Sequence, residues 1–321
     1  MSQDTQTLSM LLEAYIAKKK RLSWSTISQT KPAWKHLIAA VGDMDVADFR
    51  YAEAEDYESY LFSLGLRARS VKSYLTAVRP VFGWATRHKY TAANPFEDYK
   101  MPRVPAGEIH IYSQAELRDI LAVANLRWQA LVMTAATAGL RKSEALNLRI
   151  DDVDFERQMI TIQPHKETND AWGWAPKSFE RRTVPLAEEV SNLFCTLLAD
   201  EIPSGQPYLL LTEKQYGTRR QQLQQGRLTD RQRLRPDEGF NNTFRRIRQR
   251  AGILQGTFHD LRRTCLTHWS YHLPVQELQK LAGHADIATT MRYYLAVRGD
   301  VLDLIKKHTL TVTQTNRGDK I

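Results

Sequence analysis

The 321-residue sequence has no run of about 18 apolar residues, the length of a membrane-spanning helix, which excludes an integral membrane protein of the helical type. Its first residues, MSQDTQTLSM, have neither the basic start nor the apolar stretch of a secretory signal peptide. It has two cysteines, Cys195 and Cys265, and no C-x-x-C pair, so neither a cysteine zinc site nor a disulfide framework is expected. These absences predict a cytoplasmic protein.

The composition is that of an ordinary globular protein with a surplus of basic residues. Hydrophobic residues make up 42% and charged residues 25%, enough to build hydrophobic cores, and the length favours about two domains. Lys and Arg number 45 against 36 Asp and Glu, which gives a net charge of +9 and a pI near 9.5. This surplus favours a polyanionic partner, either nucleic acid or an anionic membrane surface.

The first hundred residues are predicted to be almost entirely helical. Apolar residues recur at helical spacing over 8–15 and 24–38, and a further short helix is predicted over 57–64. The clearest apolar stripe lies in 70–88, and it is flanked by basic and polar residues that include Arg69, Lys72, Ser73 and Arg79. Around 94–108 the periodicity stops at three prolines and a glycine, so a first domain over 1–100 and a linker over 101–110 are predicted.

The second half mixes helices with a small amount of strand. Ser113 and Glu116 form a capping box at the start of a helix over 113–125, and 128–138 is an almost wholly apolar helix. MITIQ at 159–163 and RRTVPL at 181–186 are predicted to pair as strands, joined by a polar connection. Further helices are expected over 187–200, 239–251, 259–272, 275–282 and 287–297. The Gln/Arg-rich segment 212–238 has almost nothing to bury and is predicted to be an exposed, mobile excursion.

Two motifs in this half place a charged pair on one helical face. In AGLRKSEALNL, Arg141 and Glu144 are three residues apart, so the carboxylate can hold the guanidinium in one orientation. In FHDLRRTCLTHWS, His259 and Arg262 have the same spacing, so a titratable base and a fixed cation project together. Taken singly, each motif has a plainer interpretation. The first is then a surface ion pair, and the second is a capping histidine beside a solvated arginine.

Two further features complete the set of candidate residues. In LQKLAGHADIATTMRYYL, Gly283 is expected to end a helix, His284 lies in the turn, and Tyr293 and Tyr294 follow on a new helix. Lys177 lies in the polar connection before the RRTVPL strand. A helical tyrosine usually packs with its hydroxyl at the surface, and a lysine in a hairpin is usually solvated, so each feature alone says little.

The order of these residues, however, resembles the tyrosine recombinase (phage integrase) family: Arg, Lys, His-x-x-Arg, His and then Tyr nine residues later. The flanking sequences AGLRKSEALNLR, RRTVPL, FHDLRRT and LAGHADIATTMRYY fit it too, and the resemblance covers roughly residues 8–300. It implies a mainly α (α+β) fold. A helical, SAM-like core-binding domain over 1–100 would grip DNA through Arg69, Lys72, Ser73 and Arg79. A mixed catalytic domain with a small antiparallel sheet would span 111–300, and the two would close around duplex DNA as a C-shaped clamp.

The resemblance also implies how a phosphodiester would be cleaved. Arg141 and Arg262 would clamp the scissile phosphate, and His284 would donate a hydrogen bond to it. Tyr293 would attack the phosphorus and form a 3′-phosphotyrosine link. Glu144 would stand outside the chemistry and position Arg141.

Proton transfer would fall to two other residues. His259 would act as the base for the tyrosine and as the acid in the reverse step, and Lys177 would protonate the departing 5′ oxygen. Because one phosphodiester is exchanged for another ester, neither ATP nor a metal is required, and we expect no cofactor. The absence of a G-x-x-x-x-G-K-[ST] phosphate loop agrees with this.

Several alternatives stay open from the sequence. Tyr294 adjoins Tyr293, but adjacent helical side chains point about 100° apart, so one alone can face the phosphate. Lys166 competes with Lys177, which is preferred because it precedes the VPL strand at the family's distance. The residues NDAWGWAP between the two lysines look like extra loop. The segment 212–238 is also longer than the family's pattern. It is either a loop that contacts DNA or an insertion without such a role.

The expected function is site-specific recombination of double-stranded DNA by a tetramer, in the integration and excision of a phage or other mobile element. The sequence leaves open whether an accessory DNA-bending protein takes part, and no membrane partner is expected. The tail 301–321 is predicted to dock onto a neighbouring protomer, or else onto its own domain. One rival is a type IB topoisomerase, which shares the chemistry but relaxes supercoils alone. The other is a catalytically silent DNA-binding regulator.

Overall fold

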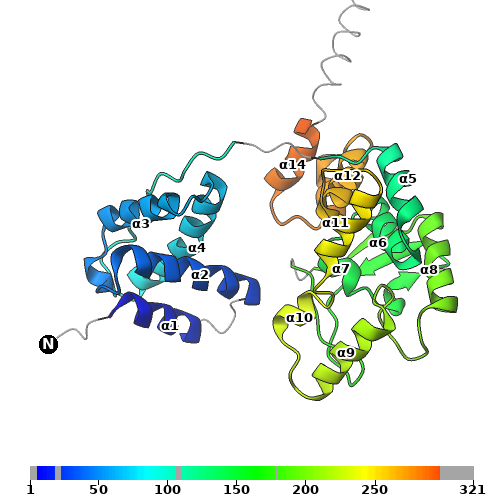
Figure 1. The fold of residues 1–321 in the computed structure, drawn as a ribbon, viewed down its shortest axis with the longest axis horizontal. Coiled ribbons are helices and arrows are strands. Elements are labelled where there is room, and N and C mark those ends of the chain that lie inside the picture. The colour runs from blue at the N-terminus through cyan, green and yellow to red at the C-terminus, as the bar shows by residue number, and fades with distance from the viewer. Residues whose placement is uncertain (1–5, 19–22, 106–109, 178–179, 297–321) are drawn as a thin grey trace, which may run out of the picture. The chain divides into compact units, whose positions relative to one another are not determined.

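The structure is a computed structural model that describes residues 6–18, 23–105, 110–177 and 180–296. It divides into two compact units, Met1–Gly107 and Glu108–Ile321 (Figure 1). Each unit has its own core of buried apolar side chains. In the ranges just given, no helix combines the length and the apolar character that crossing a membrane would require.

Unit 1 is built from α1 (Leu8–Lys18), α2 (Trp24–Val41), α3 (Tyr51–Ser63) and α4 (Ala68–Arg87), with a short 3-10 turn over Val46–Asp48. Its core is aromatic: the ring of Phe82 lies 5.4 Å from that of Trp34 and 4.6 Å from that of Phe49. The apolar stripe predicted over 70–88 forms the buried face of α4. The helix predicted over 57–64 begins earlier, at Tyr51, because Glu53 caps it by accepting a hydrogen bond from the backbone of Arg50 (2.8 Å).

Unit 2 surrounds a small antiparallel sheet of order β1-β2-β3, in which Ile160 pairs with Val153 on one side and Val184 on the other. The buried helix α6 packs against α12 and α8. The elements in this core are α5 (Gln114–Val123), α6 (Leu126–Thr137), α7 (Lys142–Leu146), a 3-10 turn (Ile150–Asp152), β1 (Val153–Asp154), β2 (Met159–Ile162), β3 (Arg182–Pro185) and α8 (Glu188–Asp200). The chain then continues through α11 (Phe240–Arg250), α12 (Phe258–Ser270), α13 (Val275–Ala282) and α14 (Ile287–Ala296). The predicted fold class, mainly helical with a small antiparallel sheet, is confirmed.

Most residues of 212–238 are exposed, as predicted, but the expectation that the segment has almost nothing to bury is wrong. The segment folds into α9 (Glu213–Gln224) and α10 (Asp230–Leu234), the yellow-green part of unit 2 in Figure 1. It buries Tyr216, Leu228 and the long side chain of Arg219, whose Nε donates to the Pro236 carbonyl (3.0 Å). The burial rests on single side chains and an arginine stem rather than on an apolar stripe, so hydropathy periodicity gave no sign of it.

Candidate active site

Three arginines surround one buried carboxylate in unit 2. Glu144 is 1% exposed and accepts hydrogen bonds from Arg141 (Nη1 to Oε1, 2.8 Å) and from both terminal nitrogens of Arg182 (3.0 and 2.6 Å). Arg262 Nη1 lies 3.9 Å from its Oε2. Glu144 Oε2 also accepts from the backbone nitrogen of Arg141 (2.7 Å), so the same carboxylate begins α7 and orients the guanidinium groups.

The charges in this cluster do not cancel. Burial alone would raise the pKa of Glu144, but the hydrogen bond and charge of Arg182 outweigh it and, with Arg141 and Arg262, lower the pKa to about 2. One carboxylate therefore faces three guanidinium groups. Burial and the charge of Arg141 lower the pKa of Arg262 to about 10, which still leaves it charged at neutral pH. The cluster keeps a surplus of positive charge, suited to an anion.

The C-terminal end of α13 holds the arginines in place. Three successive carbonyls each accept from a different arginine: Leu281 from Arg182 (3.0 Å), Ala282 from Arg262 and Gly283 from Arg141 (2.8 Å). These carbonyls lack intrahelical partners, and cations at a helix C-terminus are favoured by its dipole. Gly283 ends the helix with φ +60°, and a Cβ there would lie 3.1–3.3 Å from Arg182. The predicted helix stop is confirmed, and glycine also leaves room for an arginine.

His284 is hydrogen-bonded at both ring nitrogens. Nε2 lies 3.2 Å from Nη2 of Arg262, and Nδ1 lies 3.0 Å from the hydroxyl of Thr290. Because a guanidinium can only donate, Nε2 accepts and the ring proton is assigned to Nδ1. Burial, followed by the charges of Arg262 and Arg141, lowers the pKa of His284 to about 4, so the ring is neutral at pH 7.

The two adjacent tyrosines of α14 differ in their surroundings. The ring of Tyr293 is 7% exposed and lies parallel to that of His284, with centroids 6.1 Å apart. Burial raises the pKa of Tyr293, whereas the charge of Arg262 acts in the opposite sense. The hydroxyl of Tyr294 instead donates to the carbonyl of Leu273 (2.5 Å). Of the pair, Tyr293 is the one that faces the arginine cluster.

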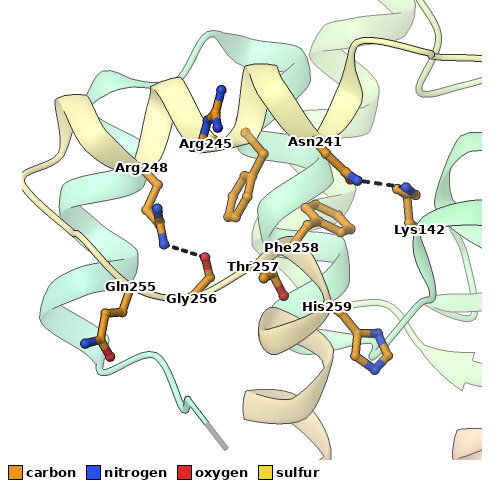
Figure 2. A pocket seen from close by; sticks show the side chains of 10 residues that line it. Lys142, Asn241, Arg245, Arg248, Gln255, Gly256, Thr257, Phe258 and His259 are labelled. Carbon is orange, nitrogen blue, oxygen red and sulfur yellow. Dashed lines mark hydrogen bonds between the residues drawn. The ribbon is translucent and has the colours of Figure 1, made fainter. Parts of the chain in front are cut away.

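His259 lies beside this cluster, in the first turn of α12, at the edge of a pocket of about 690 Å³. Figure 2 shows His259 and Lys142 on one side of the pocket and Arg248 and Gln255 on the other. Although the imidazole is exposed, the protein around it limits its hydration and, with the charge of Arg263 next, lowers the pKa of His259. A neutral imidazole at pH 7 can accept a proton.

The structure does not place the predicted lysine within the arginine cluster. Lys177 is exposed in a turn that precedes β3. The competing Lys166 is exposed as well, and its backbone carbonyl accepts from Arg149 Nη2 (3.3 Å). The contacts of the described residues therefore leave the choice between the two lysines open.

The four DNA-contacting residues predicted in unit 1 are all exposed on α4. Two of them also make intramolecular bonds: Arg69 Nη2 donates to the Pro105 carbonyl (3.4 Å), and Arg79 Nη2 donates to that of Glu97 (2.5 Å). Lys72 and Ser73 share the exposed side of the same helix.

Sequence reasoning missed Arg182 as a site residue. The sequence predicts RRTVPL as a strand and as a flanking sequence of the family, with no role for Arg182, yet Arg182 is 7% exposed at its side chain and makes the largest contribution to lowering the pKa of Glu144. A signal was available, because alternate residues of a strand share a face and Arg182 precedes the buried Val184 by two. A charged residue on the buried face of a strand needs a partner.

The comparisons with known proteins point to one family. The profile of the phage integrase family matches residues 111–298, more than half of the chain. A XerC-like tyrosine recombinase of Caldanaerobacter subterraneus is 24% identical over 278 residues, which cover 79% of this chain and 69% of the relative. A tyrosine recombinase XerA of Thermococcus kodakarensis is 28% identical over 204 residues, 61% of this chain and 62% of that protein.

Solved structures show the same fold. The Tn1549 transposon integrase in complex with transposon right end DNA has a TM-score of 0.71 at 17% identity, covering 93% of this chain and 99% of that one. A lambda integrase tetramer bound to a Holliday junction has a TM-score of 0.65 at 14% identity, covering 91% and 78%. With the family profile, these matches establish that the chain belongs to the phage integrase family of tyrosine recombinases and is an enzyme of that class.

Proposed function

We propose that this protein cuts and rejoins double-stranded DNA at specific sites through a covalent 3′-phosphotyrosine link to Tyr293. The observation that carries the proposal is the net positive cluster around Glu144, with Tyr293 stacked on His284 beside it. A phosphodiester bound there would meet the exposed edge of Arg141, which is 21% exposed at its side chain. Each terminal guanidinium nitrogen carries two hydrogens, so an arginine bonded to a carbonyl can still donate to phosphate.

In the cleavage step, the Tyr293 oxygen bonds to phosphorus while the bond from phosphorus to the 5′ oxygen breaks. The tyrosine proton passes to His259, and Lys177 supplies a proton to the departing oxygen. Arg141 and Arg262 stabilise the negative charge that builds on the nonbridging oxygens. The base is needed because burial raises the pKa of Tyr293.

Rejoining reverses these steps. The 5′ hydroxyl of a second strand attacks the phosphotyrosine, and the tyrosine leaves with the proton that His259 returns. One phosphate ester replaces another throughout, so the energy of the cleaved bond is kept and ATP is not needed. In this proposal the arginines provide the positive charge that a metal would otherwise supply.

We further propose that the protein acts as a tetramer on two DNA sites, gripping DNA with α4 of unit 1 as well as with unit 2. The lambda integrase structure, a tetramer on a Holliday junction, supports this assembly. The preferred role is integration and excision of a phage or other mobile element. The XerC-like and XerA names of the relatives favour a second role, recombination at chromosomal sites.

The test uses nicked DNA fragments from the region flanking the gene, because the attachment site of a mobile element often lies beside its integrase gene. Wild-type protein, Tyr293→Phe and Tyr294→Phe are incubated with each fragment, and covalent adducts are separated on denaturing gels. We expect the adduct to disappear with Tyr293→Phe alone. Tyr294→Phe is the matched control, since it loses one hydrogen bond to Leu273 and about 1 kcal/mol of stability.

Three results would overturn parts of the proposal. An adduct that survives Tyr293→Phe but not Tyr294→Phe would move the nucleophile by one residue. Specific binding without any adduct would indicate a silent regulator. Relaxation of an arbitrary supercoiled plasmid would indicate a type IB topoisomerase. The second role is tested by the same assay on chromosomal fragments away from the gene, and an adduct formed there but not on the flanking fragments would favour it.

A further inference from the structure

The extra residues between β2 and Lys177 form a closed loop rather than a free connection. The backbones of His165 and Trp174 pair with each other, with N to O distances of 2.7 and 3.1 Å. Within the loop, the Thr168 nitrogen donates to the carbonyl of Ala171 (2.8 Å). The chain therefore leaves the loop beside the point where it entered. The insertion adds length without moving Lys177 away from the end of β2.

Trp172 fixes this loop to the helix that carries Glu144. Its side chain is fully buried and stacks on Tyr208, with ring centroids 4.0 Å apart and planes at 14°. Its indole nitrogen donates to Oδ1 of Asn147 (2.8 Å). Asn147 caps α7 and donates from Nδ2 to the carbonyl of Ser143 (2.8 Å). The inserted loop and the arginine cluster are thus joined through one short helix.

The base of the loop is held by a second buried contact. Nε2 of His165 lies 2.9 Å from Oδ2 of Asp152, and these side chains are 10% and 2% exposed. The same carboxylate accepts from the backbone nitrogen of Arg149 (2.9 Å) and from Nε2 of Gln163 (3.0 Å). Asp152 lies in the 3-10 turn that follows α7. His165 and Trp172 of the loop are therefore both held by residues at or just after the end of α7.

Helices α9 and α10 cover the tip of the loop. The hydroxyl of Tyr216 donates to the Asp170 carbonyl (2.9 Å), and Arg220 pairs with the Asp170 side chain (2.5 Å). Arg233 pairs with Glu167. Both carboxylates are about half exposed, so these ion pairs stabilise weakly compared with the buried contacts of Trp172. The two insertions form one structural group.

Lys177 lies in the chain between the closed loop, which ends at Trp174, and β3, which contributes Arg182 to the active site. Three residue steps separate it from Trp174, so their Cα atoms are at most about 11 Å apart, and Pro176 restricts the chain between them. On the other side, β3 begins at Arg182, whose guanidinium binds Glu144. A short tether between fixed ends keeps a side chain at high local concentration near the site.

We propose that the loop 165–176, covered by α9 and α10, is a brace that positions Lys177 to protonate the 5′ leaving oxygen, and that Trp172 is its main positioning residue. This inference rests on the proposed function. It assigns one role to both insertions and selects Lys177 over Lys166, because Lys166 lies within the closed loop and Lys177 lies at its exit.

The test compares cleavage of two DNA substrates that differ in one atom. One has the natural 5′ oxygen at the cleavage site, and the other has a bridging 5′ sulfur, which leaves as a thiolate without being protonated. For each variant the rate with oxygen is divided by the rate with sulfur. Because both rates come from the same protein preparation, the ratio does not depend on the fraction that is folded.

We expect Lys177→Ala to lower this ratio by 100-fold or more, in the range of general acid catalysis, and Lys166→Ala to leave it unchanged. Trp172→Phe keeps a ring on Tyr208 but loses the bond to Asn147, and should lower the ratio by roughly tenfold, a smaller effect than the roughly 100-fold or more expected when the general acid itself is removed. Trp128→Phe is the matched control, because Trp128 is a buried tryptophan of the same unit that packs on Phe240. It should slow both substrates equally.

An unchanged ratio for Trp172→Phe, alongside a lowered ratio for Lys177→Ala, would overturn the positioning role. A ratio lowered by Lys166→Ala instead of Lys177→Ala would overturn the assignment of the acid. If the wild-type protein forms no adduct with either substrate, the proposed function itself fails, and the brace fails with it. Cleavage of the sulfur substrate by Tyr293→Phe would also contradict the scheme. The sulfur leaving group removes the need for a general acid but not the need for the nucleophile.

Discussion

Glu144 is the residue on which most of the site's electrostatics depend. Glu144→Gln would leave the buried Arg182 and Arg262 without a counter-charge. Removing one partner of a buried ion pair typically destabilises by about 3–5 kcal/mol, and we expect a loss of this size in urea unfolding, together with loss of DNA cleavage.

Glu116→Gln is a matched control for that experiment. Glu116 also closes a helix capping box, by accepting from the backbone nitrogen of Ser113 (2.8 Å), but among the described residues it pairs with His110 at 3.7 Å and with no arginine. Its loss should therefore be near 1 kcal/mol or less, the usual range for a capping interaction. Equal destabilisation by the two substitutions would mean that Glu144 acts only as a helix cap.

His284 is predicted to couple DNA binding to the uptake of protons. Its pKa of about 4 lies below the usual value of 6.5, so the unfolded chain gains a proton that the folded protein does not. The stability that depends on this group is present above pH 6.5 and is lost as the pH falls towards 4. A phosphate beside Arg262 would favour the charged ring and raise the pKa, so we expect DNA binding at pH 6 to take up protons.

Calorimetry in two buffers with different ionisation enthalpies would measure this uptake, and His284→Gln would isolate the contribution of His284 from that of His259. Uptake that is the same with and without His284 would contradict the prediction. It would mean that Thr290 donates to Nδ1 and that the neutral ring donates to phosphate from Nε2, a tautomer change that the 3.0 Å contact also permits.

At the scale of elements, the C-terminal end of α13 is predicted to be the most sensitive backbone position. Gly283→Ala places a Cβ 3.1 Å from Arg182 in addition to the strain of a left-handed residue. Gly252→Ala is the control, because its φ of +77° is similar and nothing lies within 4 Å of its Cβ.

Both substitutions should cost about 1–2 kcal/mol for the left-handed conformation. We expect Gly283→Ala to cost more in thermal or urea unfolding, and to reduce cleavage where Gly252→Ala does not, because the Arg182 side chain that binds Glu144 must shift to make room for the Cβ. If the two variants match in stability and in cleavage activity, the close approach of Arg182 to Gly283 affects neither property.

The elements that the sequence predicted well are those whose signal is local. The stripe on α4, the capping box at Ser113 and the helix stop at Gly283 each depend on residues within a few positions of one another, and the structure confirms all three. The pairing of Arg141 with Glu144 is also local, but the prediction that both lie on one helical face is wrong, because Arg141 is the N-cap of α7 with an extended backbone and Glu144 reaches back to it in a capping box.

The features that the sequence did not predict depend on distant partners. Arg182 reaches Glu144 across 38 positions, and Trp172 reaches Asn147 across 25. The segment around Trp172, NDAWGWAP, has neither helical nor strand periodicity, so the sequence predicts only a loop there. Helices α9 and α10 lack an apolar stripe, and the two residues that α9 buries have distant partners: Tyr216 donates to Asp170 across 46 positions and Arg219 to Pro236 across 17. No local spacing encodes such contacts.

At the scale of the whole molecule, both units are predicted to contribute to DNA affinity by neutralising phosphates. The variant Arg69→Ala/Lys72→Ala removes two exposed cations from α4. Each phosphate contact adds about 0.9 to the slope of log affinity against log salt, so the slope should fall by nearly two. Lys31→Ala/Lys35→Ala removes the same charge from the exposed side of α2 and should leave the slope unchanged. Equal slopes for the two variants would place DNA elsewhere on unit 1.

Assembly is the property that a single chain cannot show, and the tail 301–321, predicted to dock onto a neighbouring protomer, lies outside the described residues. It follows α14, which carries Tyr293, so docking in trans would let a neighbour control when Tyr293 enters its site. Deleting 301–321 should then impair joining between two DNA sites far more than binding or cleavage at one. Gel-shift, adduct and two-site recombination assays on the same preparation separate these steps. Parallel loss in all three would instead mean that the tail packs on its own unit, because a fold defect removes binding along with exchange.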